Sequence, residues 1–183
     1  MKKFFFILFI FLCLGLSQVL ADERKNQLNK LFDDLKISSE SSSFLIEQKI
    51  WKLWSTHPND EKLTTLLAEG SAAVNNNQLT EAINIFTKVI GLDPNWAEAW
   101  NKRATVFYLV GQFQKSQDDI DKVLNLEKRH FGALAGQGLV NIQVKNFEKA
   151  IKSYQKALEI YPSMRSPEIM IKEIEALIKQ ELI

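Results

Sequence analysis

Apolar residues in the central part of the chain recur three or four positions apart, which is the spacing of helices with one apolar face. Short polar or glycine-containing stretches interrupt this pattern and predict turns between paired helices, at 75–78, 110–112 and 144–146. The whole pattern returns after 34 residues without a gap, which defines three units, 63–96, 97–130 and 131–164. The chain therefore predicts three consecutive helical hairpins of equal length.

Equivalent positions in the three units hold residues of matching size. The eighth and twentieth positions are small in every unit: Gly70, Ala104 and Gly138, then Ala82, Ser116 and Ala150. The twenty-fourth position is large in every unit: Phe86, Ile120 and Tyr154. Small side chains let two helix backbones approach closely, and the large side chain fills the space beside them. Because a hairpin this short cannot cover its apolar face alone, the units are expected to stack into a solenoid.

Further helices are predicted on both sides of the repeats. The segment 22–57 holds two short amphipathic runs separated by serines, and it predicts a degenerate helical hairpin that covers the first repeat. The segment 166–182 begins with Ser166, Pro167 and Glu168, which supply a cap, a first-turn proline and a first-turn acid. This segment predicts a helix that caps the last repeat. No strand is predicted.

The first 21 residues differ in composition from the rest. Two lysines precede an unbroken apolar run, and small or aliphatic residues lead to Ala21, so the segment 1–21 predicts a secretory signal peptide. Cleavage is expected after Ala21, with cleavage after Ser17 as the alternative. An uncleaved helix in the inner membrane is a further alternative, because the apolar run just reaches the minimum spanning length. Cys13 is the only cysteine, so the mature chain would contain no thiol.

The charge balance argues against nucleic acid as a partner. Two of the 23 basic residues lie in 1–21, which leaves 21 basic against 22 acidic side chains, and nucleic-acid binding needs a concentrated positive field. His57 and His130 are the only histidines and lie far apart in the sequence, so neither a zinc site nor a catalytic base network is predicted. The acidic run at 118–121 lacks the glycine and the closing glutamate of an EF-hand. We expect no metal, no cofactor and no catalysis.

The repeat pattern resembles the tetratricopeptide repeat (TPR). The resemblance is carried by Trp100 in the second unit and by the run "EKAIKSYQKALEIYP" at 148–162, which is close to the consensus of that family. It covers residues 63–166 and implies an all-α, TPR-type α-solenoid that binds other proteins without catalysing a reaction. The wider chain is also similar to exported TPR proteins of alphaproteobacteria, a group to which no biochemical activity is attached.

The resemblance further implies a concave peptide-binding groove, lined by the first helix of each unit. The groove positions that it implies are Leu67, Ser71, Val74, Asn101, Thr105, Tyr108, Ala135, Leu139 and Ile142. Chaperone-binding TPRs hold a carboxylate with basic and amide side chains at sites that correspond here to Leu67, Ser71, Gly132 and Gly136. No carboxylate clamp is therefore expected, and the apolar strip that remains suits an apolar helix or peptide. In the alternative, the flanking helices cover this strip.

Two charged features stand out against this pattern. Arg103 replaces the usual leucine at the seventh position, and TPRs with arginine there often carry an acid where this chain has Asp119, so the resemblance implies a partly buried ion pair. In the last unit, lysines recur along one helix face at Lys145, Lys149, Lys152 and Lys156. We expect a solvated face with Glu148 paired to Lys152. Attraction to anionic lipid or to an acidic partner is the alternative.

These patterns together predict a non-catalytic TPR adaptor or scaffold of the bacterial envelope. The expected location is the periplasm, and the expected partner is an unidentified protein or peptide. The alternative is an assembly factor or complex subunit that an uncleaved segment 1–21 retains at the inner membrane, and contact with the membrane is expected only in that case.

Overall fold

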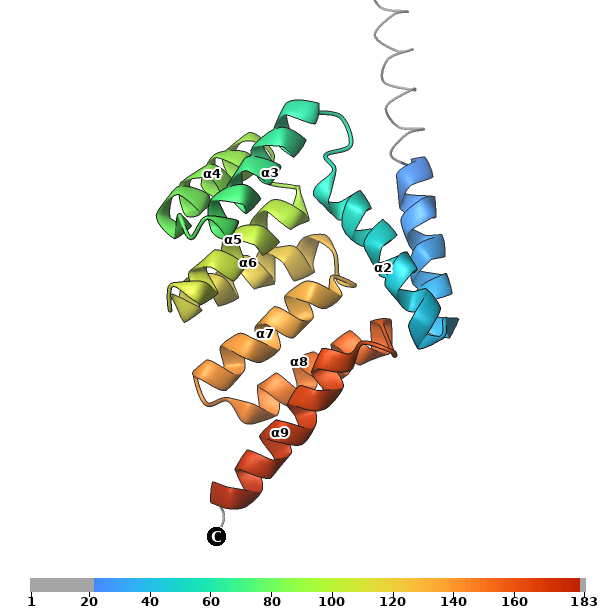
Figure 1. Cartoon of the computed structure of the whole chain (residues 1–183), viewed down its shortest axis with the longest axis vertical. Coiled ribbons are helices and arrows are strands. Elements are labelled where there is room, and N and C mark those ends of the chain that lie inside the picture. Colours follow the sequence, from blue (N-terminus) through green and yellow to red (C-terminus); the bar gives the residue numbers. More distant parts are fainter. Residues whose placement is uncertain (1–21, 182–183) are drawn as a thin grey trace, which may run out of the picture.

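All regular secondary structure in the computed structural model, which describes residues 22–181, is helical (Figure 1). Residues 22–37 form the first helical segment, and α2 follows at Glu40–Ser55. The three predicted hairpins are α3 (Glu61–Asn75) with α4 (Leu79–Leu92), α5 (Ala97–Leu109) with α6 (Phe113–Leu126), and α7 (Phe131–Gln143) with α8 (Phe147–Ile160). The last helix is α9 (Arg165–Glu181). The prediction of an all-α solenoid is confirmed, whereas the predicted signal peptide at 1–21 and residue 182 of the predicted capping helix lie outside the described residues.

The same turn closes each hairpin. Asn77, Gly111 and Lys145 occupy equivalent positions and have positive φ angles of 58°, 74° and 57°. In each turn the following backbone N–H donates to the carbonyl five residues earlier, at distances of 2.7 to 2.8 Å. This is the Schellman pattern, in which one left-handed residue satisfies the last carbonyls of the first helix and reverses the chain. Each second helix can therefore run antiparallel to the first.

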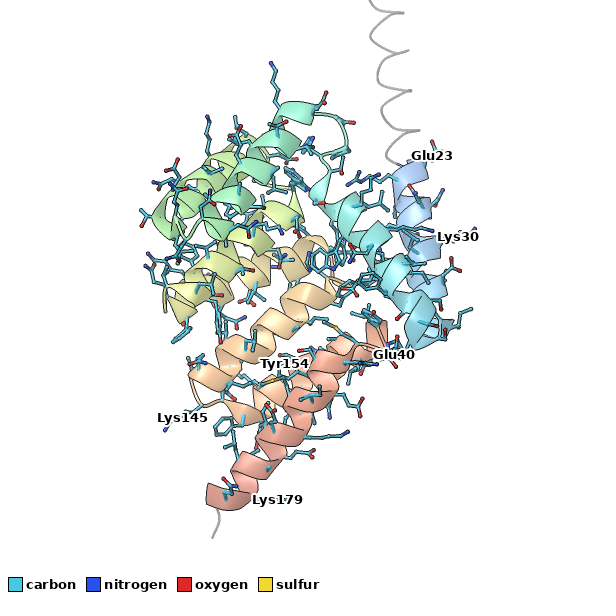
Figure 2. All side chains as sticks on the ribbon, viewed as in Figure 1. Glu23, Lys30, Glu40, Lys145, Tyr154 and Lys179 are labelled. Carbon is cyan, nitrogen blue, oxygen red and sulfur yellow. The ribbon has the colours of Figure 1, made fainter. Side chains whose placement is uncertain are left out.

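The two helices of each hairpin approach most closely at the columns of small residues. A β-carbon built at Gly138 would lie 2.4 Å from the Tyr154 ring, which lies between α7 and α8 (Figure 2). A β-carbon at Gly70 would lie 2.5 Å from the Phe86 ring. In the second hairpin the Ser116 hydroxyl donates to the carbonyl of Ala104 at 2.8 Å. The small columns of the sequence therefore mark contacts within hairpins.

Neighbouring hairpins pack side by side, α4 against α5 and α6 against α7. α9 packs against α8 and covers the outer side of the last hairpin, where Ile174 joins Ala150 and Tyr154 in one buried cluster (Figure 1). Within residues 22–181, no helix combines the length and the apolar character needed to cross a bilayer.

The N-terminal hairpin, made of residues 22–37 and α2, does not lie where the sequence predicted. Instead of covering the first repeat, α2 runs along the edge of the solenoid where successive hairpins are joined (Figure 1). The last residues of the first two repeats contact it directly. Trp96 Nε1 donates to the carbonyl of Trp54 at 2.7 Å, and the His130 ring stacks on the Trp54 ring at 4.0 Å. Met164, the last residue of the third repeat, packs against the buried apolar cluster that contains Trp54, Leu35 and Phe131.

Polar contacts follow the same edge. His57 Nε2 lies 2.9 Å from Asp93 Oδ2, and the Tyr161 hydroxyl donates to Glu47 Oε2 at 3.1 Å. Asp93 and Tyr161 stand at the same position of the first and third repeats, so α2 and the residues that follow it span all three repeats.

Aromatic packing explains why the hairpin prefers this edge. Trp54 and Phe32 of the hairpin are buried against Phe131, with ring centroids 5.1 and 6.5 Å from the Phe131 ring, and Tyr161 lies 5.4 Å from the same ring. Each such pair contributes about 0.5–1.5 kcal/mol beyond its buried area. The large apolar residues that can receive these rings lie at the boundaries between repeats.

Candidate functional site

Two adjoining cavities lie among the first helices of the three hairpins. The larger measures about 270 Å³, and predicted groove residues Ser71, Val74, Asn101 and Thr105 line it. The smaller measures about 60 Å³, and its lining includes predicted groove residues Asn101, Thr105, Tyr108 and Leu139. Asn101, Thr105 and Gly132 belong to both linings, so the two cavities are neighbours. The structure thus brings six of the nine predicted groove residues together.

The other three predicted groove residues line neither cavity. Leu67 is only 2% exposed and belongs to the buried cluster of the first hairpin, with Ala82 and Phe86. Leu67 is therefore not a groove residue, because its side chain is buried against other residues of its own repeat. Ala135 and Ile142 pack against the buried cluster beneath α9.

Trp51 of α2 forms a wall of the larger cavity that the repeat pattern did not reveal. Its indole Nε1 donates to Glu47 Oε1 at 3.0 Å, and its ring meets the Trp54 ring edge to face at 5.2 Å. Gly132 makes room for it, since a β-carbon there would lie 2.6 Å from the Trp51 ring. α2 therefore covers one side of the strip and leaves the two cavities beside it. The signal in the sequence for this wall was Gly132, a glycine at the second position of the third repeat, which leaves space for a large side chain.

Beneath this wall lies a buried polar cluster centred on Glu98, whose side chain is fully enclosed. Glu98 Oε2 accepts from Asn101 Nδ2 at 3.0 Å and lies 3.1 Å from His130 Nε2, while Lys102 Nζ lies 3.4 Å from Oε1. His130 Nδ1 accepts from the backbone N–H of Ala133 at 3.1 Å, so the ring hydrogen belongs on Nε2, which donates to Glu98.

This cluster is structural. His130 caps the start of α7 and stacks on Trp54, and its side chain is fully enclosed, so no substrate reaches the imidazole. His57 is also held, between Asp93 and the Trp96 ring. Both histidines thus fasten the N-terminal hairpin to the repeats, a role that sequence reasoning missed because they share no position in the 34-residue pattern. Within residues 22–181, no three His, Cys, Asp or Glu side chains are grouped to hold a metal ion.

Arg103 and Asp119 lie together between α5 and α6. Arg103 donates from Nε and Nη2 to the two carboxylate oxygens, both at 2.8 Å, which is a bidentate pair. Its Nη1 donates to Thr87 Oγ1 of α4 at 3.0 Å, and the guanidinium lies 5.0 Å from the centre of the Trp100 ring. The pair therefore links three helices away from the cavities.

The lysines of the last repeat are exposed, and Lys145 projects from the turn between α7 and α8 (Figure 2). The expected pairing of Glu148 with Lys152 is not found among the ion pairs of the described residues, so this detail of the prediction is wrong. Both side chains are exposed on the helix surface, where an ion pair gains little and the ordering of two long side chains opposes it.

Comparison with known proteins agrees with this architecture. Two family models of the tetratricopeptide repeat match residues 63–95 and 132–164. A TPR repeat-containing protein of Rhizobium etli is 32% identical over 143 residues, which cover 78% of this chain and 70% of that protein.

Two solved structures share the fold at lower sequence identity. The first TPR domain of Spaghetti (RPAP3), bound to the HSP90 peptide SRMEEVD, has a TM-score of 0.63 and 21% identity, over 66% of this chain and 96% of that one. The TPR2B domain of yeast Sti1, in its pHsp70 complex, has a TM-score of 0.61 and 17% identity, over 64% of this chain and 99% of that one. The repeats, the fold and the relative in Rhizobium etli lead to one conclusion: the chain belongs to the tetratricopeptide repeat proteins.

Proposed function

We propose that this protein is a non-catalytic adaptor that binds an apolar segment of a partner protein between α2 and the first helices of its repeats. The observation that carries the proposal is the pair of adjoining cavities across α3, α5 and α7, with Trp51 as a side wall of the larger one. Such a site is preorganised, because Trp51 is held by Glu47 and by the neighbouring aromatic rings.

The lining indicates the chemistry of the partner. The larger cavity combines the apolar surfaces of Trp51, Val74 and Val106 with neutral polar side chains, and the smaller one adds Tyr108 and Leu139. Lys102 is the single charged residue that lines either cavity, and its ammonium group is already paired with Glu98. A segment with apolar side chains and few charges therefore fits, bound as a helix or an extended chain.

The similar structures support a peptide partner, since the first TPR domain of RPAP3 is bound to a peptide of HSP90. A carboxylate clamp does not follow from this likeness. Ser71, Gly132 and Gly136 stand where the family resemblance implies amide and basic groups, and none of them carries a charge.

Export to the periplasm is part of the proposal and is supported by the composition of residues 1–21. The competing function is an assembly factor tethered to the inner membrane by the same segment. Intact mass of the protein purified from its native cells, together with fractionation, separates the two. Loss of residues 1–21 with recovery in the periplasmic fraction supports release, and a full-length mass in the membrane fraction supports the tether.

The binding site is tested by crosslinking in cells from a photoreactive phenylalanine at Tyr108. A matched probe at Lys122, which is exposed on α6, serves as the control position. A partner captured from Tyr108 should be lost in a Leu139→Glu variant and kept in a Leu177→Glu variant, because these residues are 37% and 45% exposed but only Leu139 lines a cavity. Equal capture from both probe positions would contradict the proposal.

A further inference from the structure

A second surface, separate from the groove, lies between the second helices of the last two repeats. It is a cleft of about 580 Å³ between α6 and α8. Lys149, Lys152 and Lys156 form its α8 wall, and Gln117 and Asp121 lie on the α6 wall. The walls thus carry three positive side chains against one negative.

No salt bridge within the described residues neutralises these lysines. None of the ion pairs among residues 22–181 includes Lys149, Lys152 or Lys156. Asp121, the acid that shares the cleft, accepts a hydrogen bond at 2.8 Å from Gln117 of its own helix. The cleft therefore keeps a net positive charge within the fold.

The repeat supplies an internal comparison for this charge. The positions of Lys149, Lys152 and Lys156 correspond to Glu81, Asn84 and Lys88 in the first repeat and to Lys115, Asp118 and Lys122 in the second. The net charge at these three positions is zero in α4, one positive in α6 and three positive in α8. Because equivalent positions occupy equivalent places in each hairpin, the scaffold does not require the lysines.

The cleft also contains buried polar groups. Asn141 and Ser153 line it and are only 8% and 4% exposed, beside the apolar side chains of Val140 and Val144. The Ser153 hydroxyl donates to Gln137 Oε1 at 3.0 Å, which leaves the amide nitrogen of Gln137 as a donor. A ligand that enters therefore meets ammonium groups on one wall and hydrogen-bonding groups as well, a combination that suits carboxylates.

We propose that this cleft binds an acidic segment of a partner protein. Lys149, Lys152 and Lys156 are spaced by three and four residues, so along α8 they lie about 4.5 and about 6 Å apart. A partner helix with glutamates at i, i+3 and i+7 presents the same spacing and places one carboxylate near each ammonium group. The interaction does not depend on the groove and adds a second contact to a partner, or a contact with a second partner.

The test measures binding of a fluorescent helical peptide with three glutamates at that spacing, by anisotropy, to the chain from residue 22 onward. The lysine variant is Lys149→Gln, Lys152→Gln and Lys156→Gln combined. The matched control removes the same charge from exposed lysines of the N-terminal hairpin, at Lys30, Lys36 and Lys49. Exposed surface substitutions of this kind leave the fold intact.

The lysine variant should bind the peptide about tenfold more weakly, whereas the control should change affinity less than about twofold. Affinity should also fall when salt is raised from about 50 to about 300 mM, and a peptide with glutamines in place of the glutamates should not bind. If the two triple variants lost equal affinity for the peptide, the proposal would be overturned, because the peptide would then respond to the net charge of the protein and not to the cleft. Binding of the lysine face to vesicles of anionic phospholipid, with none to the peptide, would overturn it as well. A Leu139→Glu variant should bind the peptide normally, which separates this cleft from the groove.

Discussion

Removing either partner of the Arg103–Asp119 pair is expected to lower the free energy of unfolding by much more than the loss of an exposed ion pair would. The two side chains are only 15% and 5% exposed and share two hydrogen bonds of 2.8 Å. Removing one partner leaves the other charge uncompensated in a site with little water, at a cost of roughly 3 kcal/mol. We therefore expect Asp119→Ala to lower the free energy of unfolding by about 3 kcal/mol.

The two single substitutions should differ in a defined direction. Arg103 also donates to Thr87 at 3.0 Å and lies over the Trp100 ring, so Arg103→Ala removes additional contacts worth about 1 kcal/mol. In the double variant no isolated charge remains. It should therefore cost no more than Arg103→Ala alone, which corresponds to a coupling energy of at least about 3 kcal/mol, the loss expected for Asp119→Ala.

Urea unfolding followed by tryptophan fluorescence measures this coupling in the four chains of a double-mutant cycle. The exposed pair of Lys172 with Glu168 is the control, with an Nζ to Oε1 distance of 2.7 Å and side chains 70% and 62% exposed. Its coupling should stay below about 0.5 kcal/mol. If the sum of the two single-variant losses in unfolding free energy equals the double-variant loss to within about 0.5 kcal/mol, the two side chains are not coupled and the prediction is wrong.

Three further expectations concern the last repeat. Gly138→Ala should destabilise the fold by about 1–3 kcal/mol in urea unfolding because its β-carbon overlaps the Tyr154 ring, whereas Gly136→Ala, with its nearest contact at 3.7 Å, should be neutral or stabilising by up to about 1 kcal/mol. Lys145→Gly should raise the free energy of unfolding by about 1 kcal/mol, since glycine adopts its φ of 57° without strain; an unchanged midpoint in thermal unfolding would refute this. Burial, with smaller effects of neighbouring charges, raises the pKa of Tyr154 to about 12, so the folded chain keeps a proton that the unfolded chain loses near pH 10. Stability should therefore fall between pH 10 and pH 12, by at most about 2–3 kcal/mol, and Tyr154→Phe should remove that part of the decline in alkaline unfolding curves.

The 34-residue period predicts the columns of small residues and the turns at Asn77 and its equivalents, because both recur in every unit. The Arg103–Asp119 pair occurs in the second unit only and was implied by the resemblance to TPRs; both of its partners lie within one hairpin. The position of α2 is different, because its contacts join Trp54 to Trp96 and His130, and Glu47 to Tyr161. Trp96 and His130 share one column of the repeat but not a residue type, and a periodicity argument relies on likeness of type.

At the candidate binding site, too, residues inside the repeats could be predicted from the sequence and residues outside them could not. The cavity residues of α3, α5 and α7 were predictable from their places in the repeat, whereas Trp51 was not, since it lies outside the repeats and reaches the cavity through tertiary packing. Leu67 was misplaced because residues of one column do not all face the groove: Leu67 is buried in its own hairpin, whereas Asn101 at the same position lines both cavities. Bulky residues at the end of each repeat were the available signal for a helix docked along that edge.

The position of α2 restricts how far the three repeats can move independently of one another. A repeat protein ordinarily responds to heat or to a ligand one neighbour at a time, since each unit touches only the next. Here one helix, α2, is attached to all three units, through Trp54 to Trp96 and His130 and through Glu47 to Tyr161. A rotation of one unit relative to its neighbours would strain its contacts with α2. These contacts therefore hold the three units in a constant relative orientation. These contacts oppose independent fraying of the terminal units and hold the width of the cavity beside Trp51.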